Sequence, residues 1–212
     1  MALVNPRRHL PFWACIVLST ASPAVAAMIL WAMGRAPYYQ SGPITLWYGD
    51  AWGPQNSQQL TDPYTFTHVT HGILLYWLLH LVARRVPVRA RGALAMCIES
   101  AWEVFENTAM VINRYRAATM ALGYYGDSVL NSMGDILACA VGFLIAACLP
   151  TRATVILVLA LEVTLALWIR DSLLLNVVML IYPIAAVKTW QLRAAAITST
   201  VAPGTIRPAG AA

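Results

Sequence analysis

Six stretches of this chain consist mainly of hydrophobic residues, and short segments rich in glycine, proline or charged residues separate them. The stretches cover about 11–33, 66–83, 92–112, 128–149, 153–169 and 172–190. A helix needs about 20 mostly apolar residues to cross the hydrocarbon core of a membrane. The pattern therefore predicts an all-α fold, a polytopic transmembrane bundle of about six helices in one domain over 1–192. Residues 193–212, rich in Ala, Thr, Pro and Gly, are predicted to form a disordered tail.

The composition supports a membrane protein over a soluble one. Of the 212 residues, 59% are hydrophobic and only 11% are charged, and the mean hydropathy is +0.63. Ordinary soluble domains carry roughly a quarter charged residues, so this chain lacks the charge to cover a surface exposed to water. We expect the lipid bilayer to be its partner. The net charge of +5 does not indicate nucleic-acid binding, because its distribution along the chain follows membrane topology.

The first hydrophobic stretch has two interpretations. Small residues at 24–27 are compatible with a cleaved signal peptide, but the apolar run continues through 28–31 and is long for a signal. We interpret it as a retained anchor. The loop at 34–65 is rich in glycine, proline and aromatic residues, which favour the membrane–water interface, so we expect it to cap the bundle.

Arginine and lysine residues predict the orientation of the bundle. With the N-terminus inside, ten fall on the cytoplasmic side: Arg7, Arg8, Arg84, Arg85, Arg89, Arg91, Arg152, Lys188, Arg193 and Arg207. The opposite side holds Arg35, Arg114, Arg116 and Arg170. This asymmetry fits the positive-inside rule. It predicts a protein of the bacterial inner (cytoplasmic) membrane with both termini in the cytoplasm.

The acidic residues lie where a membrane helix tolerates them least. Glu99, Glu103, Glu106, Asp135 and Glu162 fall within the apolar stretches. A charged side chain at the centre of a bilayer helix costs about 2.5–3.5 kcal/mol even on the lenient insertion scale. These side chains are therefore expected to face the protein interior, where they pair with one another or bind something.

The spacing of the polar residues agrees with that expectation. Glu99, Glu103 and Glu106 fall on one face of a helix at 92–112. Asp127, Asn131 and Asp135 recur every four residues at the start of the next helix, where the small residues Gly134, Ala138 and Gly142 favour close helix packing. His68 and His71 lie one turn apart at the start of the helix at 66–83.

These residues predict a polar pocket that opens to the periplasmic side. Imidazole and carboxylate together suit a divalent metal such as zinc, iron or manganese, and we predict His68 and His71 as metal ligands. The predicted catalytic residues are Glu103, Glu106, Asp127 and Asp135, and the predicted substrate-binding residues are Asn107, Arg114, Arg116 and Asn131. No stretch matches a known metal signature, however, and buried His–carboxylate pairs also occur as structural networks. Glu99 is expected either to serve as a relay or to pair with His80.

Five motifs resemble an uncharacterised family of bacterial multi-pass membrane proteins, family 0314. They are HVTHG at 68–72, ESAWEVFENT at 99–108, YGDSVLNSMGD at 125–135, IRD at 169–171 and LNV at 175–177. The likeness extends from about residue 60 to 192. It implies a location in the cell membrane, but it supplies no activity and no catalytic residues.

Three functions are compatible with a buried polar site of this kind. The first is a metal-dependent hydrolase of a lipid or envelope substrate. The second is a non-catalytic assembly or scaffold protein in which the polar stripes specify the fold. The third is a proton-coupled transporter, which the lack of an internal repeat and of clearly broken helices disfavours.

Overall fold

The structure is a computed structural model, and it describes the backbone of residues 10–201 and the side chains of residues 10–193. This part of the chain contains eight helices and no strand, which confirms the all-α fold. The helices are α1 (Phe12–Ala32), α2 (Thr65–Val82), α3 (Val88–Glu106), α4 (Ala109–Ala118), α5 (Val129–Cys148), α6 (Thr151–Trp168), α7 (Leu173–Ile181) and α8 (Ala185–Val201). Arg7, Arg8 and Arg207, which the orientation argument used, lie outside the described residues.

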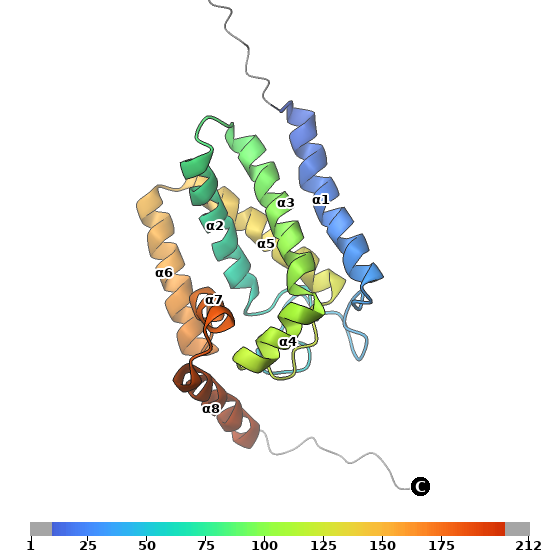
Figure 1. Cartoon of the computed structure of the whole chain (residues 1–212), viewed down its shortest axis with the longest axis vertical. Helices are drawn as coiled ribbons and strands as arrows, with labels where there is room; N and C mark the ends of the chain where they lie inside the picture. Colours follow the sequence, from blue (N-terminus) through green and yellow to red (C-terminus); the bar gives the residue numbers. More distant parts are fainter. Residues whose placement is uncertain (1–9, 202–212) are drawn as a thin grey trace, which may run out of the picture.

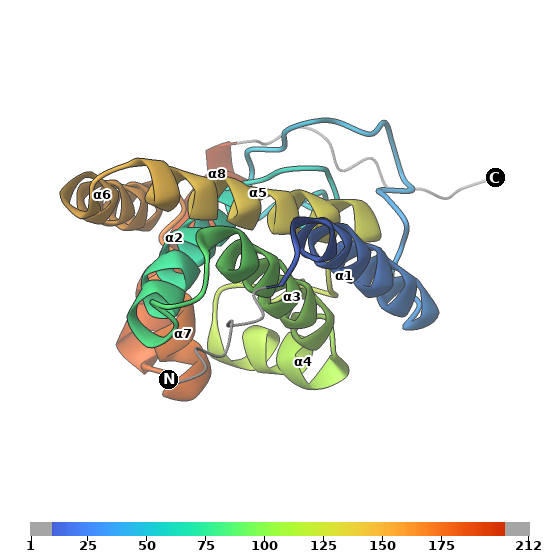
Figure 2. The ribbon, with the colours of Figure 1, turned by 90° about the horizontal axis from the view of Figure 1, so that it is seen from above.

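The five long helices α1, α2, α3, α5 and α6 form the bundle (Figure 1). Seen from above, α5 runs along one side, and α1, α2 and α3 pack against it (Figure 2). The shorter helices α4 and α7 lie on the other side of α2 and α3 (Figure 2). The core between these layers consists of Ala26, Leu79, Ala95, Met96, Ile136, Cys139 and Phe143.

Glycine residues allow α2 and α5 to touch through their backbones. A Cβ atom on Gly72 would collide with the carbonyl oxygen of Cys139, and one on Gly142 would collide with that of Val69. The same is true of Gly134 and the carbonyl oxygen of Leu60, in the loop before α2. Gly142 therefore lets α2 approach α5 as predicted, whereas Gly134 lets the loop before α2 approach. This close packing holds the polar start of α2 against that of α5.

Three helices, α1, α5 and α6, are long and apolar enough to cross a membrane. Large hydrophobic side chains project outward from α1 and α6; Trp31 is 72% exposed, Ile156 67% and Leu167 78%. Side chains of this kind on the outside of a bundle are stable in lipid rather than in water. The structure thus indicates membrane association.

The predicted helix at 92–112 is two helices in the structure. Asn107 ends α3, and Thr108 has an extended conformation (ψ 150°) that redirects the chain into α4. The Asn107 side chain explains the break, because its Nδ2 atom donates to the carbonyl oxygen of Glu103 at 3.0 Å and to Oδ2 of Asp127 at 2.8 Å. This contact holds the end of α3 against the loop that leads into α5.

The predicted stretch at 172–190 is also divided in two. Helix α7 ends at Ile181 and α8 begins at Ala185. Pro183 lies between them, and proline disfavours a helical conformation in the residue before it, where Tyr182 is extended. With 9 residues, α7 is only about 14 Å long at 1.5 Å per residue.

The start of α1 and the end of α8 lie at opposite ends of the molecule (Figure 1). Helix α8 continues through Val201, so the first part of the predicted disordered tail is helical. The remainder of that tail, 202–212, lies outside the described residues.

Candidate functional site

His68, on α2, lies at the centre of a cluster of carboxylates contributed by α3 and α5. Its Nδ1 atom is 2.7 Å from Oε1 of Glu99 and 3.3 Å from Oε1 of Glu103, both on α3. Its Nε2 atom is 3.9 Å from Oδ2 of Asp135 on α5, and Thr65 donates a 3.1 Å hydrogen bond to the other oxygen of Asp135. His68 and the three carboxylates are all buried. The acidic residues of the apolar stretches, Glu162 excepted, thus meet inside the bundle.

His71 joins the cluster through Glu99. Its Nδ1 atom lies 3.1 Å from the same Oε1 atom that contacts His68, and the two imidazole rings are 4.9 Å apart. Glu99 is therefore shared by two histidines. His80 instead contacts Arg91 at 3.0 Å, so the expected alternative pairing of Glu99 with His80 does not occur.

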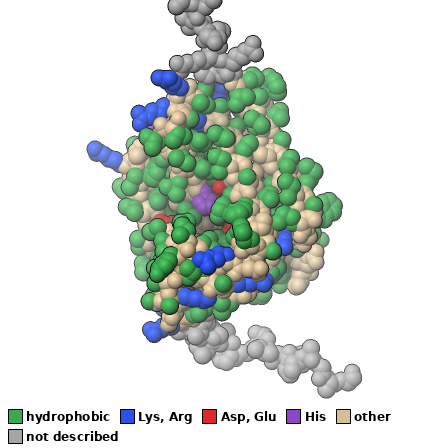
Figure 3. Space-filling model, in the orientation of Figure 1, with side chains coloured by type: hydrophobic (Ala, Val, Ile, Leu, Met, Phe, Trp, Pro, Cys, Tyr) green, Lys and Arg blue, Asp and Glu red, His purple; other side chains and the backbone are tan. Residues whose placement is uncertain are grey.

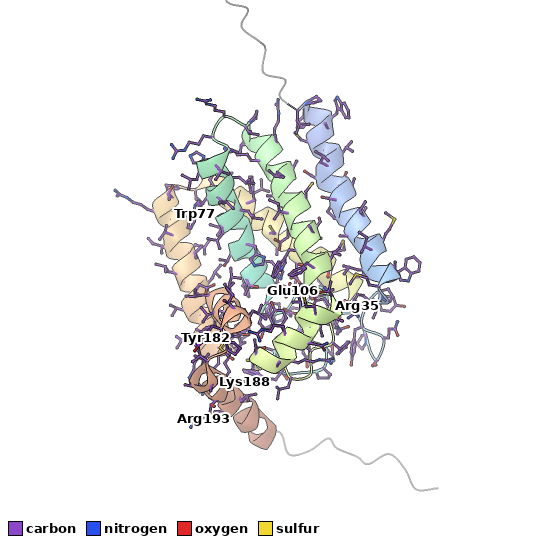
Figure 4. All side chains as sticks on the ribbon, in the orientation of Figure 1. Arg35, Trp77, Glu106, Tyr182, Lys188 and Arg193 are labelled. Atoms are coloured by element: carbon purple, nitrogen blue, oxygen red, sulfur yellow. The ribbon has the colours of Figure 1, made fainter. Side chains whose placement is uncertain are left out.

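Two groups of side chains in this cluster have the geometry of a metal site. One consists of His68, His71 and Glu99, and the other of His68, Glu103 and Glu106. Within each group, the ligand atoms lie within 4.8 Å of one another. Glu106 stands at the end of α3 and faces the interior of the bundle (Figure 4). Sequence analysis did not assign Glu99 to the site, although it shares a helix face with Glu103 and Glu106.

Asp127 is close to the cluster but has its own hydrogen-bond partners. Its carboxylate accepts hydrogen bonds from Asn107 Nδ2 at 2.8 Å and from the Tyr124 hydroxyl at 2.9 Å. Its backbone N–H donates to Oδ1 of Asn107 at 2.7 Å. Burial raises the pKa of the Asp127 carboxyl, and the hydrogen bonds from Tyr124 and Asn107 oppose that rise. Asp127 and Asn107 thus join the end of α3 to the loop before α5.

Asn131 binds the loop that precedes α2. Its Nδ2 atom donates to the backbone oxygen of Gln59 at 2.9 Å and lies 3.4 Å from Oδ2 of Asp62. Asp62 also accepts hydrogen bonds from the backbone N–H groups of Ser57 and Tyr64. Burial raises the pKa of the Asp62 carboxyl against these hydrogen bonds. Loop residues of this kind have no periodicity that a sequence pattern could detect.

Arg114 and Arg116 hold backbone segments together beside the site. Arg114 donates to the carbonyl oxygens of Leu180 at 2.7 Å and Ile181 at 3.3 Å, at the end of α7. Arg116 donates to the carbonyl oxygen of Tyr124. The two guanidinium groups thus attach α4 to its neighbours.

A cavity of about 780 Å³ adjoins the cluster. The predicted site residues that line it are His68, His71, Glu106, Asp127, Asn131 and Asp135, and Glu99 lines it as well. The other predicted site residues, Glu103, Asn107, Arg114 and Arg116, do not line it. The cavity lining also includes the apolar side chains of Leu74, Ile98, Val177 and Leu180. Histidine and acidic side chains are visible in a hollow on the side of the molecule, surrounded by hydrophobic side chains (Figure 3). The cavity lining thus combines polar and apolar side chains.

A further carboxylate, Asp171, lines the same cavity at the turn between α6 and α7. It accepts hydrogen bonds from the Tyr64 hydroxyl at 3.0 Å and from Gln191 Nε2 at 3.1 Å. Burial raises the pKa of the Asp171 carboxyl to about 7, against these hydrogen bonds and one from the Ser172 backbone. Asp171 thus links the starts of α2 and α7 to α8.

Comparison with known proteins identifies the family. A family model described as "Protein of unknown function (DUF2585)" matches residues 30–193. A UPF0314 protein of Rhizobium meliloti is 50% identical over 187 residues, which cover 88% of this chain and 94% of the relative. Another from Paracoccus denitrificans is 45% identical over 185 residues, 87% of this chain and 94% of the relative. No solved structure matches. The chain belongs to the UPF0314 family, a family of uncharacterised function, as the motifs around its histidines and acids suggested.

Proposed function

We propose that this protein is a metal-dependent hydrolase embedded in the bacterial inner membrane, acting on a lipid or envelope substrate. One observation carries the proposal: His68, His71 and Glu99 bring three ligand atoms within 4.8 Å of one another at the wall of a large cavity. Two imidazoles and one carboxylate form a ligand set that suits zinc, iron or manganese.

The local structure supports a metal site at these residues. His68 and His71 lie one turn apart on α2, so that both rings point toward Glu99 on α3. Three protein ligands leave coordination positions free for substrate or water, as catalytic metal sites do. A divalent ion held there would supply Lewis acidity for hydrolysis.

The remaining carboxylates provide groups that can move protons. Asp135 lines the cavity next to His68, which is the position that a general base requires. Glu103 is fully buried and does not line the cavity. We propose Asp135 as the acid–base residue, with Asp127 positioning the loop before α5 through Asn107.

The cavity wall suggests how the substrate binds. Asn131 is the one predicted substrate-binding residue that lines the cavity, and we propose that it contacts the polar part of the substrate. Leu74, Ile98 and Val177 provide an apolar surface for a hydrocarbon chain. Arg114 and Arg116 contribute by holding α4 in place through backbone carbonyls.

We also propose that α1, α2, α3, α5 and α6 cross the membrane, with the turns after α2 and α5 in the cytoplasm. Arg84, Arg85 and Arg89 at the first turn and Arg152 at the second agree with that orientation. A sixth crossing within 172–190 stays a prediction. A reporter fused after Arg193 decides the point, because a cytoplasmic signal indicates six crossings and a periplasmic signal five.

Elemental analysis of the purified protein tests the metal centre. We expect at least one divalent ion per chain in the wild type and a loss of bound metal in the His68→Ala/His71→Ala double variant. His80→Ala is the matched control, since it removes an imidazole from the same helix but outside the cluster. A folded wild type that binds no divalent ion would contradict the proposal and favour a structural role for the polar network.

A further inference from the structure

Glu103 is the least satisfied carboxylate of the cluster. Its side chain is fully buried, at 0% exposure, and neither carboxylate oxygen has a hydrogen-bond partner among the described residues. Its nearest charged neighbour, Nδ1 of His68, lies 3.3 Å away but is closer to Glu99, at 2.7 Å. A buried carboxylate without a partner is strongly unfavourable. This site therefore requires something that the described side chains do not supply.

The basic residues near this end of the bundle do not provide the missing charge. Within residues 10–193, each ion pair of the cluster joins a histidine to a carboxylate. Arg114, Arg116 and Lys188 donate to backbone carbonyl oxygens instead. The positive charge that balances the cluster must come from another source.

The number of carboxylates exceeds what one ion can balance. Glu99, Glu103, Glu106 and Asp135 surround His68 and carry four negative charges when ionised. A divalent ion at His68, His71 and Glu99 would balance half of them. Two divalent ions would balance all four.

We propose that Glu103 and Glu106, with His68, bind a second divalent cation, so that the centre holds two metal ions. The ligand atoms of these three residues lie within 4.8 Å of one another. His68 belongs to both groups, and its Nδ1 atom faces Glu99 at 2.7 Å and Glu103 at 3.3 Å, so His68 lies between the two positions. This inference rests on the proposed function, which places the first ion.

The donor set indicates which metals fit. The two groups together contain three carboxylates and two imidazoles, one carboxylate fewer than the set that helical bundles use to bind pairs of iron or manganese ions. Carboxylate ligands favour manganese over zinc in relative terms, because zinc prefers imidazole and thiolate. The second position, which has two carboxylates and one imidazole, therefore suits Mn²⁺ or Fe²⁺.

Manganese binding to the full-length protein in detergent tests the second site. Protein stripped with a chelator is titrated with MnCl₂ alone, and bound manganese is counted by elemental analysis and examined by electron paramagnetic resonance. We expect about two ions per chain, with the spectrum of a spin-coupled pair. Glu103→Gln should lower the count to about one and leave an uncoupled spectrum, whereas Glu103→Asp should restore the coupled pair.

Two further variants make the result specific. Glu106→Gln changes a half-buried ligand of the same group and should also remove one ion. Glu162→Gln is the matched control, because Glu162 lies on α6 outside both ligand groups and accepts a hydrogen bond from the backbone of Leu174. It should retain both ions.

The outcomes separate this inference from the proposed function. One ion per chain that is lost in His71→Ala but kept in Glu103→Gln would overturn the second site and leave the first intact. No bound ion in a folded wild type would overturn both proposals.

Discussion

The two ends of the bundle use their basic residues differently. At the turns after α2 and α5, Arg84, Arg85, Arg89 and Arg152 are exposed and donate no hydrogen bond within the described residues. At the other end, arginine and lysine side chains bind backbone carbonyl oxygens: Arg35 that of Tyr125, Arg114 those of Leu180 and Ile181, Arg116 that of Tyr124, Arg170 that of Trp190 and Lys188 that of Ala117.

This difference separates two roles of positive charge in a membrane protein. In the proposed topology, the exposed arginines at one end orient the bundle in the membrane. Bound arginines at the other end fix the loops and short helices that surround the cavity. Because these arginines are engaged elsewhere, none of them pairs with the carboxylates around His68 in the described structure.

The largest expected effect comes from removing the centre of the site. We expect His68→Ala to weaken divalent-metal binding by more than about 100-fold, since even outer partners of metal ligands contribute about 10–100-fold. Isothermal titration with MnCl₂ or ZnCl₂ measures the change. Arg84→Ala, at the opposite end, should bind metal like the wild type; equal losses in the two variants would contradict the assignment of the site to one end.

The pH dependence of stability should come from the site end as well. Folding raises the pKa of the Asp171 carboxyl to about 7, so the folded chain holds this proton more tightly than the unfolded chain does. The stabilisation is complete below about pH 4, the ordinary range of an aspartate, and is lost as the pH rises through about 7. Its size is of the order of 4 kcal/mol.

Thermal unfolding in detergent between pH 5 and 8 measures this effect. The wild type should lose stability relative to Asp171→Asn as the pH rises, because the amide does not titrate. Tyr64 and Gln191 contact Asp171, and Glu162 lies near enough to raise its pKa. A constant difference between the two proteins across this range would show that Asp171 keeps one charge state throughout.

The bound arginines should contribute moderately to stability. Arg114→Ala removes two hydrogen bonds to the end of α7 and leaves two carbonyl groups without their donor. We expect a loss of about 1–3 kcal/mol in the free energy of unfolding, measured by denaturation in detergent. Arg114→Lys should recover only part of it, because an ammonium group lacks the forked geometry of guanidinium.

The sequence predicted the parts of the site that follow helical periodicity. Glu103, Glu106, Asp135, His68 and His71 all lie on inward faces, because a buried charge in an apolar helix must turn toward the protein interior. The same reasoning includes Glu99, whose spacing matches that of Glu103. The hydrophobic pattern likewise located the five long helices of the bundle.

Contacts between distant segments could not be predicted in this way. Gln59, Asp62 and Tyr64 belong to a loop without periodicity. Their partners, Asn131 and Asp171, lie about 70 or more residues further along the chain. The breaks at Asn107 and Pro183 lie within otherwise continuous apolar stretches. Hydropathy averages over such single residues, so it predicted one helix where the structure has two.

The smallest effect on stability is expected at the turn after α2. Arg84→Ala combined with Arg85→Ala should change the free energy of unfolding by less than about 0.5 kcal/mol, because both side chains are exposed and donate no hydrogen bond in the described structure. The same change should instead lower the fraction of molecules inserted with this turn in the cytoplasm. Labelling of a cysteine introduced at Val86 with a membrane-impermeant reagent measures that fraction. A loss of stability comparable to that of Arg114→Ala, with no change in labelling, would mean that both ends of the bundle use arginine for the same structural purpose.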